Sequence, residues 1–122
     1  MKKTTKAEFR RFEKEARRLQ LLFGLTDWHF YFTHGRPDDV KDADFFACVA
    51  CEDGAVATFW LNDELDDRDY AQSNPERHAL HEVLHVMTWP LKGLAERRYI
   101  QPGSPEEEWE RLVRRLEKVV KV

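Results

Sequence analysis

Residues 74–89 read NPERHALHEVLHVMTW, a stretch that predicts a capped helix with one apolar side. Asn74 is a residue type that caps free backbone amides, and Pro75 suits the first helical position. Apolar residues then recur at helical spacing, namely Leu80, Val83, Leu84 and Met87. His81 and His85 lie at the edge of this stripe. We therefore expect the helix to pack by one side against the domain, with two imidazoles at the rim of the core.

Residues 81–85 read HEVLH, which is a complete H-E-x-x-H pattern. On a helix the two histidines lie one turn apart, so both can reach one ion while the intervening glutamate projects beside it. A catalytic zinc site needs three protein ligands and an open position for water. The pattern predicts His81 and His85 as metal ligands and Glu82 as general base. The alternative is an amphipathic helix whose histidines only pack.

The chain before this helix predicts one helix and three strands. Apolar residues from Phe9 to Phe23 recur at helical spacing, and Gly24 stands where that helix would stop. Residues 27–33 alternate as a half-buried strand with an aromatic face. Residues 45–51 and 55–61 are apolar runs joined by Glu52-Asp53-Gly54, which is a hairpin signal. The acidic residues 62–69 are expected to form a solvated loop without chemistry.

After the HEVLH helix, Pro90 is expected to end or kink it, and a last helix is expected from residue 104. Ser104 and Glu107 have capping-box spacing, and the predicted buried face comprises Trp109, Leu112, Val113, Leu116 and Val120. The fold class is therefore α+β in a single domain over residues 1–122. It comprises an N-terminal helix, a small, mainly antiparallel three-stranded sheet, the HEVLH helix and a C-terminal helix.

Composition excludes several classes of function. The 122 residues include 20 Lys plus Arg and 23 Asp plus Glu, so a net charge of -3 gives no field that favours nucleic acid or an anionic membrane. No apolar run approaches 18 residues, and the charged N-terminal residues do not form a signal peptide. We expect a soluble, cytoplasmic protein. Cys48 and Cys51 are expected to be free thiols of a strand rather than a redox or metal-binding pair.

At this point the chain resembles the zincin metallopeptidases, and in size and layout it is similar to small metallopeptidase-like proteins encoded by bacteriophages. The resemblance runs through WHFYF, VATFWLND, HALHEVLHVM followed by WPL, and ERLVRRLEKVV, of which only HEVLH is a specific motif. It implies a Zn²⁺ cofactor, a peptide or protein substrate and a place in the host cytoplasm. It also implies that the strand at residues 55–61 lines the cleft and pairs with the substrate, as an edge strand can.

The third metal ligand is the least defined part of the predicted site. The metzincin motif would need glycine at Thr88 and histidine at Leu91, and no His, Asp or Cys follows His85. The chain therefore resembles the gluzincin type, with a glutamate as third ligand. We favour Glu110, on the margin of the last helix's apolar face, because the phage-type sequences carry a glutamate before a similar valine-arginine-leucine run. The alternatives are Glu106 as ligand, a surface ion pair of Glu110 with Arg114, and an all-histidine site that includes His78.

These residues predict a zinc-dependent metallopeptidase in which Glu82 takes the proton of the attacking water. Candidate donors to the developing oxyanion are Tyr99, His78 and Arg98. Two other functions stay open at this stage. One is a non-catalytic zinc-binding phage protein that holds a peptide or protein partner in the cleft. The other is a small partner-binding domain without metal.

Overall fold

A computed structural model describes residues 1–39, 45–98 and 104–120. Its elements, in chain order, are β1 (Lys2–Lys3), α1 (Lys6–Leu22), β2 (His29–His34), β3 (Ala47–Glu52), β4 (Val56–Leu61), β5 (Glu64–Leu65), α2 (Asp67–Gln72), α3 (Pro75–Arg98) and α4 (Ser104–Val119). The α+β class and the predicted order of the main elements are confirmed. None of the helices in the described ranges is long and apolar enough to cross a bilayer.

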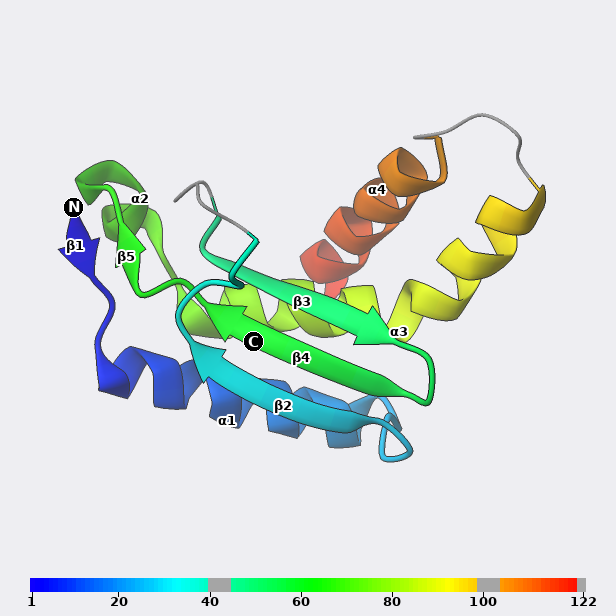
Figure 1. The fold of residues 1–122 in the computed structure, drawn as a ribbon, viewed down its shortest axis with the longest axis horizontal. Helices are drawn as coiled ribbons and strands as arrows, with labels where there is room; N and C mark the ends of the chain where they lie inside the picture. Colours follow the sequence, from blue (N-terminus) through cyan, green and yellow to red (C-terminus); the bar gives the residue numbers. More distant parts are fainter. Residues whose placement is uncertain (40–44, 99–103, 121–122) are drawn as a thin grey trace.

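The main sheet has the strand order β2-β4-β3, so β4 lies in the centre (Figure 1). β3 and β4 pair antiparallel, as expected of a hairpin, and Gly54 adopts the positive φ that its turn needs. The pairing of β2 with β4 is parallel, which the sequence analysis did not anticipate. The sheet is thus mixed. A second sheet joins β1 and β5 antiparallel.

Aromatic packing accounts for the position of β2. The parallel register sets Phe32 beside Phe59, and their two rings stack with centroids 5.0 Å apart. The ring of Phe30 also contacts that of Phe59, with centroids 4.7 Å apart. Phe12 of α1 meets the same cluster edge-on. Because Phe12 and Phe59 are fully buried, this cluster forms the centre of the core. Burial of such large rings supplies more free energy than the difference between a parallel and an antiparallel ladder.

Two helices cover one face of the main sheet, and a third packs outside them. α1 and α3 lie side by side behind the strands, and α4 packs on α3 beyond the β3 edge (Figure 1). Arg11 of α1 donates two hydrogen bonds of 2.8 Å to Glu76 at the start of α3, which ties the two helices together. Val113 of α4 is fully buried against α3. The HEVLH segment therefore lies between the sheet and α4.

Local signals fix the start of α3, but two other local expectations were wrong in whole or in part. The Asn74 carboxamide oxygen accepts from the Arg77 amide at 3.1 Å, which confirms the predicted cap. Of the two effects predicted for Pro90, an end or a kink of the helix, the end is wrong, because α3 continues to Arg98. Residues 62–69 are not a plain loop, since they contain β5 and, after the Asp66 cap, the first residues of α2.

Candidate metal centre

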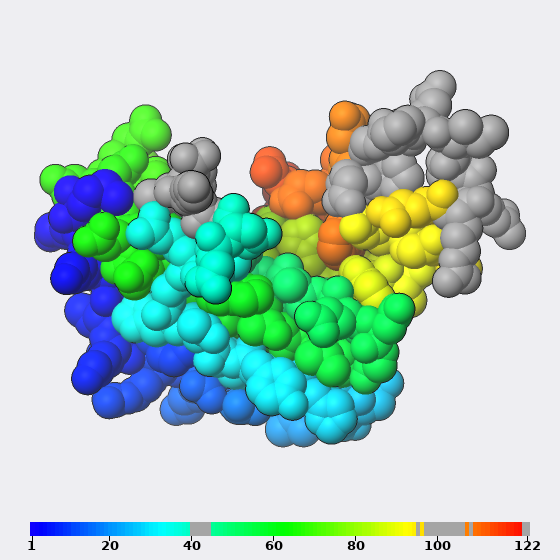
Figure 2. Space-filling model, in the orientation of Figure 1, coloured from blue at the N-terminus to red at the C-terminus, as the bar shows by residue number. Residues whose placement is uncertain are grey.

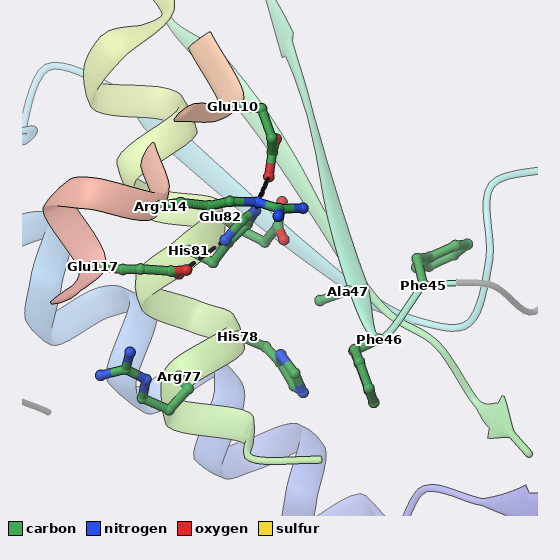
Figure 3. Close-up of a pocket in the computed structure, with 10 residues that line it drawn as sticks. All are labelled: Phe45, Phe46, Ala47, Arg77, His78, His81, Glu82, Glu110, Arg114 and Glu117. Atoms are coloured by element: carbon green, nitrogen blue, oxygen red, sulfur yellow. Dashed lines mark hydrogen bonds and ion pairs between the residues drawn. The ribbon is translucent and has the colours of Figure 1, made fainter. Parts of the chain in front are cut away.

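Three predicted ligands from two helices converge at one point. Figure 3 draws two of them, His81 and Glu110. His81 Nε2 lies 3.0 Å from one carboxylate oxygen of Glu110, and His85 Nε2 lies 3.1 Å from the other. The two imidazole nitrogens face each other at 3.2 Å. The histidines come from adjacent turns of α3 and Glu110 from α4, so the packing of α4 on α3 assembles the group. This group could hold a metal ion.

The spacing of the three side chains fits a small divalent cation. A tetrahedral ion with bonds of about 2.0 Å separates its ligand atoms by about 3.3 Å, which agrees with the distances above. Two imidazoles and one carboxylate are also a donor set found in catalytic metal sites that keep one position open. Among the described residues, the group of His81, His85 and Glu110 meets the geometric requirement for a metal site.

A second glutamate of α4 orients His81. Glu117 accepts a hydrogen bond from His81 Nδ1 at 2.9 Å. When the proton of a neutral His81 ring lies on Nδ1 and is donated to Glu117, the lone pair of Nε2 is directed at Glu110 and His85, as metal binding requires. Glu117 was only one of several downstream glutamates in the sequence. Its position two turns after Glu110 on the same face of a helix is the signal that identifies it.

α4 is anchored next to the third ligand by Trp109. The indole Nε1 donates to Thr88 Oγ1 at 2.6 Å, and Thr88 in turn donates to the Leu84 carbonyl at 2.7 Å. The Trp109 ring also meets the His85 ring edge-on, with centroids 4.5 Å apart. Trp109 therefore contacts His85 of α3 directly, and it fixes the position of Glu110, its neighbour in sequence, along α3.

Glu82 lies beside the ligand group and is buried, with 8% of its surface exposed. Burial raises its pKa well above the ordinary value for a glutamate, and the negative charges of Glu110 and Glu117 raise it further. Three carboxylates thus surround two imidazoles. A cation in the ligand group would offset the repulsion among them and favour the ionised form of Glu82.

A pocket of about 430 Å³ opens onto the group. In Figure 2 it corresponds to the hollow between the residues that lead into β3 and the orange helix α4, with α3 at its floor. Its lining comprises Phe45, Phe46, Ala47, Arg77, His78, His81, Glu82, Glu110, Arg114 and Glu117 (Figure 3). Three of the four residues of the predicted site, His81, Glu82 and Glu110, thus line the pocket, and His85 contacts two of them.

The strand at the cleft is β3 and not the predicted strand at residues 55–61. β4 is hydrogen-bonded to β2 on one side and to β3 on the other, so its backbone is already paired. β3 is an edge strand of the sheet, and the residues at its start line the pocket. The prediction failed because the sequence does not show that β2 pairs with β4 rather than with β3.

The alternative ligands have different outcomes. His78 does not belong to the ligand group. Its ring stacks on Phe46 with centroids 4.3 Å apart, and its Nε2 accepts from the Asn74 amide at 3.2 Å. Burial, with a smaller effect of His81, lowers its pKa to about 4.

The expected contact of Glu110 with Arg114 is present at 3.3 Å, alongside the contacts with both histidines. Tyr99 and the side chains of Glu106 and Arg98 lie outside the described residues.

The two cysteines take no part in the ligand group. Cys48 and Cys51 are free and half-buried on β3. Residues three apart on a strand point to opposite faces of the sheet, so the two thiols are expected on different faces. Burial raises the pKa of each thiol to about 12, so both are protonated at neutral pH. A protonated, half-buried thiol is a poor ligand and a poor nucleophile.

Comparison of the chain with protein-family models, with curated proteins and with solved structures gave no match.

Proposed function

We propose that this protein is a zinc-dependent peptidase. The observation that supports the proposal is the convergence of His81, His85 and Glu110 within 3.2 Å of one another, next to the buried Glu82 and at the floor of an open pocket. In this proposal the first three residues hold the ion and Glu82 is the general base. Zinc bound there would lower the pKa of its water ligand towards 7 and polarise a carbonyl group.

The chain's own residues would supply the proton transfers. Glu82 would accept the proton of the attacking water and then deliver it to the leaving nitrogen of the peptide bond. Its burial suits this role, because a carboxyl group with a raised pKa holds a proton long enough to act as an acid in the second step. Glu117 would keep the imidazole of His81 in its orientation throughout.

The peptide would bind in extended form along β3. An edge strand offers backbone groups to a partner strand whatever the partner's sequence. The start of β3 is also where the pocket opens, so a peptide paired there would pass over Glu82. A domain of this size leaves little room for deep specificity pockets, so we propose an exposed segment of a partner protein as substrate rather than proteins in general.

Metal content and hydrolysis, measured on the same samples, test this function. We expect near-stoichiometric zinc by elemental mass spectrometry and cleavage of at least one member of a mixed fluorogenic peptide library. Glu82→Gln should keep the zinc and lose activity by 10²-fold or more. Glu110→Ala should lose the zinc, whereas Glu107→Ala, an exposed residue of the same helix, should keep both zinc and activity.

Three results would contradict the proposal. Activity retained in Glu82→Gln would exclude this general base, and zinc retained in Glu110→Ala would exclude this third ligand. Stoichiometric zinc and peptide binding with no cleavage by the unmodified protein would support the non-catalytic zinc-binding protein instead.

A further inference from the structure

His78 has an unusual position that the metal group and the fold leave without a role. It stands one turn before His81 on α3 and lines the same pocket as Glu82. Two contacts hold its ring in one orientation. Phe46 stacks on it nearly parallel, at an interplanar angle of 14°, and the Asn74 amide donates to its Nε2.

The hydrogen bond from Asn74 defines where the ring proton lies. Because Nε2 accepts a hydrogen bond, it carries the lone pair, and the single proton of the neutral ring is on Nδ1. This is the less common tautomer, so the backbone at the start of α3 selects it. In Figure 3 the second nitrogen lies on the side towards His81 and Glu82. Within residues 1–39, 45–98 and 104–120, the recorded hydrogen bonds of His78 include no acceptor for Nδ1.

We propose that His78 Nδ1 donates a hydrogen bond to a carbonyl oxygen of the peptide bound in the cleft. The proposal rests on the peptidase function argued above and adds a residue that touches the substrate. An N–H group fixed before the substrate arrives costs little to reorganise, which is what makes such donors effective on a carbonyl that gains negative charge. The stacking on Phe46 also places this donor next to β3, where the peptide would pair.

Two substitutions separate the role of the N–H donor of His78 from that of its aromatic ring. His78→Phe keeps an aromatic ring for the stack on Phe46 and removes the N–H group. His78→Asn places an amide nitrogen near the position of Nδ1. With a peptide that the unmodified protein cleaves, we expect His78→Phe to lower kcat/KM roughly 10²-fold and His78→Asn to stay within about tenfold of the unmodified protein. Zinc content should be unchanged in both.

The tautomer gives a readout that does not depend on activity. Long-range ¹H–¹⁵N NMR spectra should show His78 neutral, with its proton on Nδ1. A proton on Nε2 would overturn the proposal, and so would unchanged kcat/KM in His78→Phe. Loss of zinc from His78→Phe would also overturn it, because His78 would then be a ligand. If the unmodified protein cleaves no peptide, the peptidase function itself fails. If the unmodified protein and His78→Phe cleave a peptide equally well, only the role of His78 fails.

Discussion

Glu117 shows how one carboxylate prepares a ligand without belonging to the ligand group. Its hydrogen bond to His81 Nδ1 holds the plane of the ring and favours the tautomer that leaves Nε2 without a proton. Loss of such a partner commonly weakens metal binding by about 10- to 100-fold. We therefore expect Glu117→Ala to weaken zinc binding by this factor, measured by competition with a chromophoric chelator. Glu107→Ala on the exposed side of α4 is the control, and equal affinity for the two variants would exclude the orienting role.

His78 contributes to the dependence of stability on pH in the acid range. Its pKa of about 4 in the folded protein lies below the ordinary 6.5, so the unfolded chain takes up the proton more readily. The folded state is therefore favoured fully above pH 6.5 and progressively less as the pH falls towards 4, by up to about 3 kcal/mol.

Urea unfolding in the presence of a chelator, between pH 7 and pH 4, measures this dependence. We expect His78→Phe to lose part of the acid sensitivity, so that its stability relative to the unmodified protein improves as the pH falls. Parallel pH profiles for the two proteins would contradict the assigned pKa.

The residues of the site differ in how far the sequence predicts them. His81, Glu82 and His85 form a five-residue pattern whose meaning follows from the helix alone. Glu110 and Glu106 could not be separated by geometry, because which glutamate faces α3 depends on how α4 packs. Glu110 was favoured by its place on the margin of the apolar face and by a resemblance, and the structure brings it to the two histidines. Its function as a ligand stays a prediction.

At the scale of elements, the contact of Trp109 with Thr88 controls how α4 sits on α3. Thr88→Val keeps the shape of the side chain but leaves the indole N–H without its acceptor, at a cost of about 1–3 kcal/mol. We expect this loss in chemical denaturation, together with weaker zinc binding, because Glu110 follows Trp109 directly. Thr88→Ser keeps the hydroxyl group and serves as the matched control. Equal losses in both variants would assign the effect to packing instead.

Elements whose signals are local were predicted well. The hairpin of β3 and β4, the Asn74 cap and the amphipathic α1 each depend on residues within a few positions of one another. Pro90 is the exception. A proline removes one backbone hydrogen bond and strains the preceding turn, yet α3 continues to Arg98; Val86 and Trp89 of that preceding turn pack in or against the core, which holds it in place.

At the scale of the whole molecule, the parallel pairing of β2 and β4 lies beyond local signals. The two strands are separated by the whole of β3, and they are held together by their backbone ladder and by the shared contact of Phe30, Phe32 and Phe59. The same pairing places β4 in the centre and leaves β3 at the edge. An error about one strand pair therefore became an error about which strand meets the cleft.

The fold also predicts an uneven response to metal. α4 packs mainly on α3, and the ligand group joins these two helices. Zinc at a thousandfold excess over its Kd should stabilise the protein by about 4 kcal/mol, seen as a rise in Tm. Hydrogen exchange should slow more in α4 than in α1 when zinc is added, because α4 has fewer other contacts.

The variant Glu110→Gln is the control for this response. It removes one charged ligand atom of the group while keeping the shape of the side chain, and it should show neither the rise in Tm nor the protection of α4. Uniform protection across α1 and α4 would instead indicate that the metal acts on the fold as a whole.

The division of the ligand group between α3 and α4 has a consequence for synthesis. A ribosome makes the chain from the N-terminus, so His81, Glu82 and His85 exist before Glu110 and Glu117 have been added. Until then the two histidines have neither the third ligand nor the orienting carboxylate. In the peptidase proposed above, a growing chain would thereby be kept from acting on itself or on its neighbours at the ribosome, since the centre would be completed only after α4 has emerged and docked.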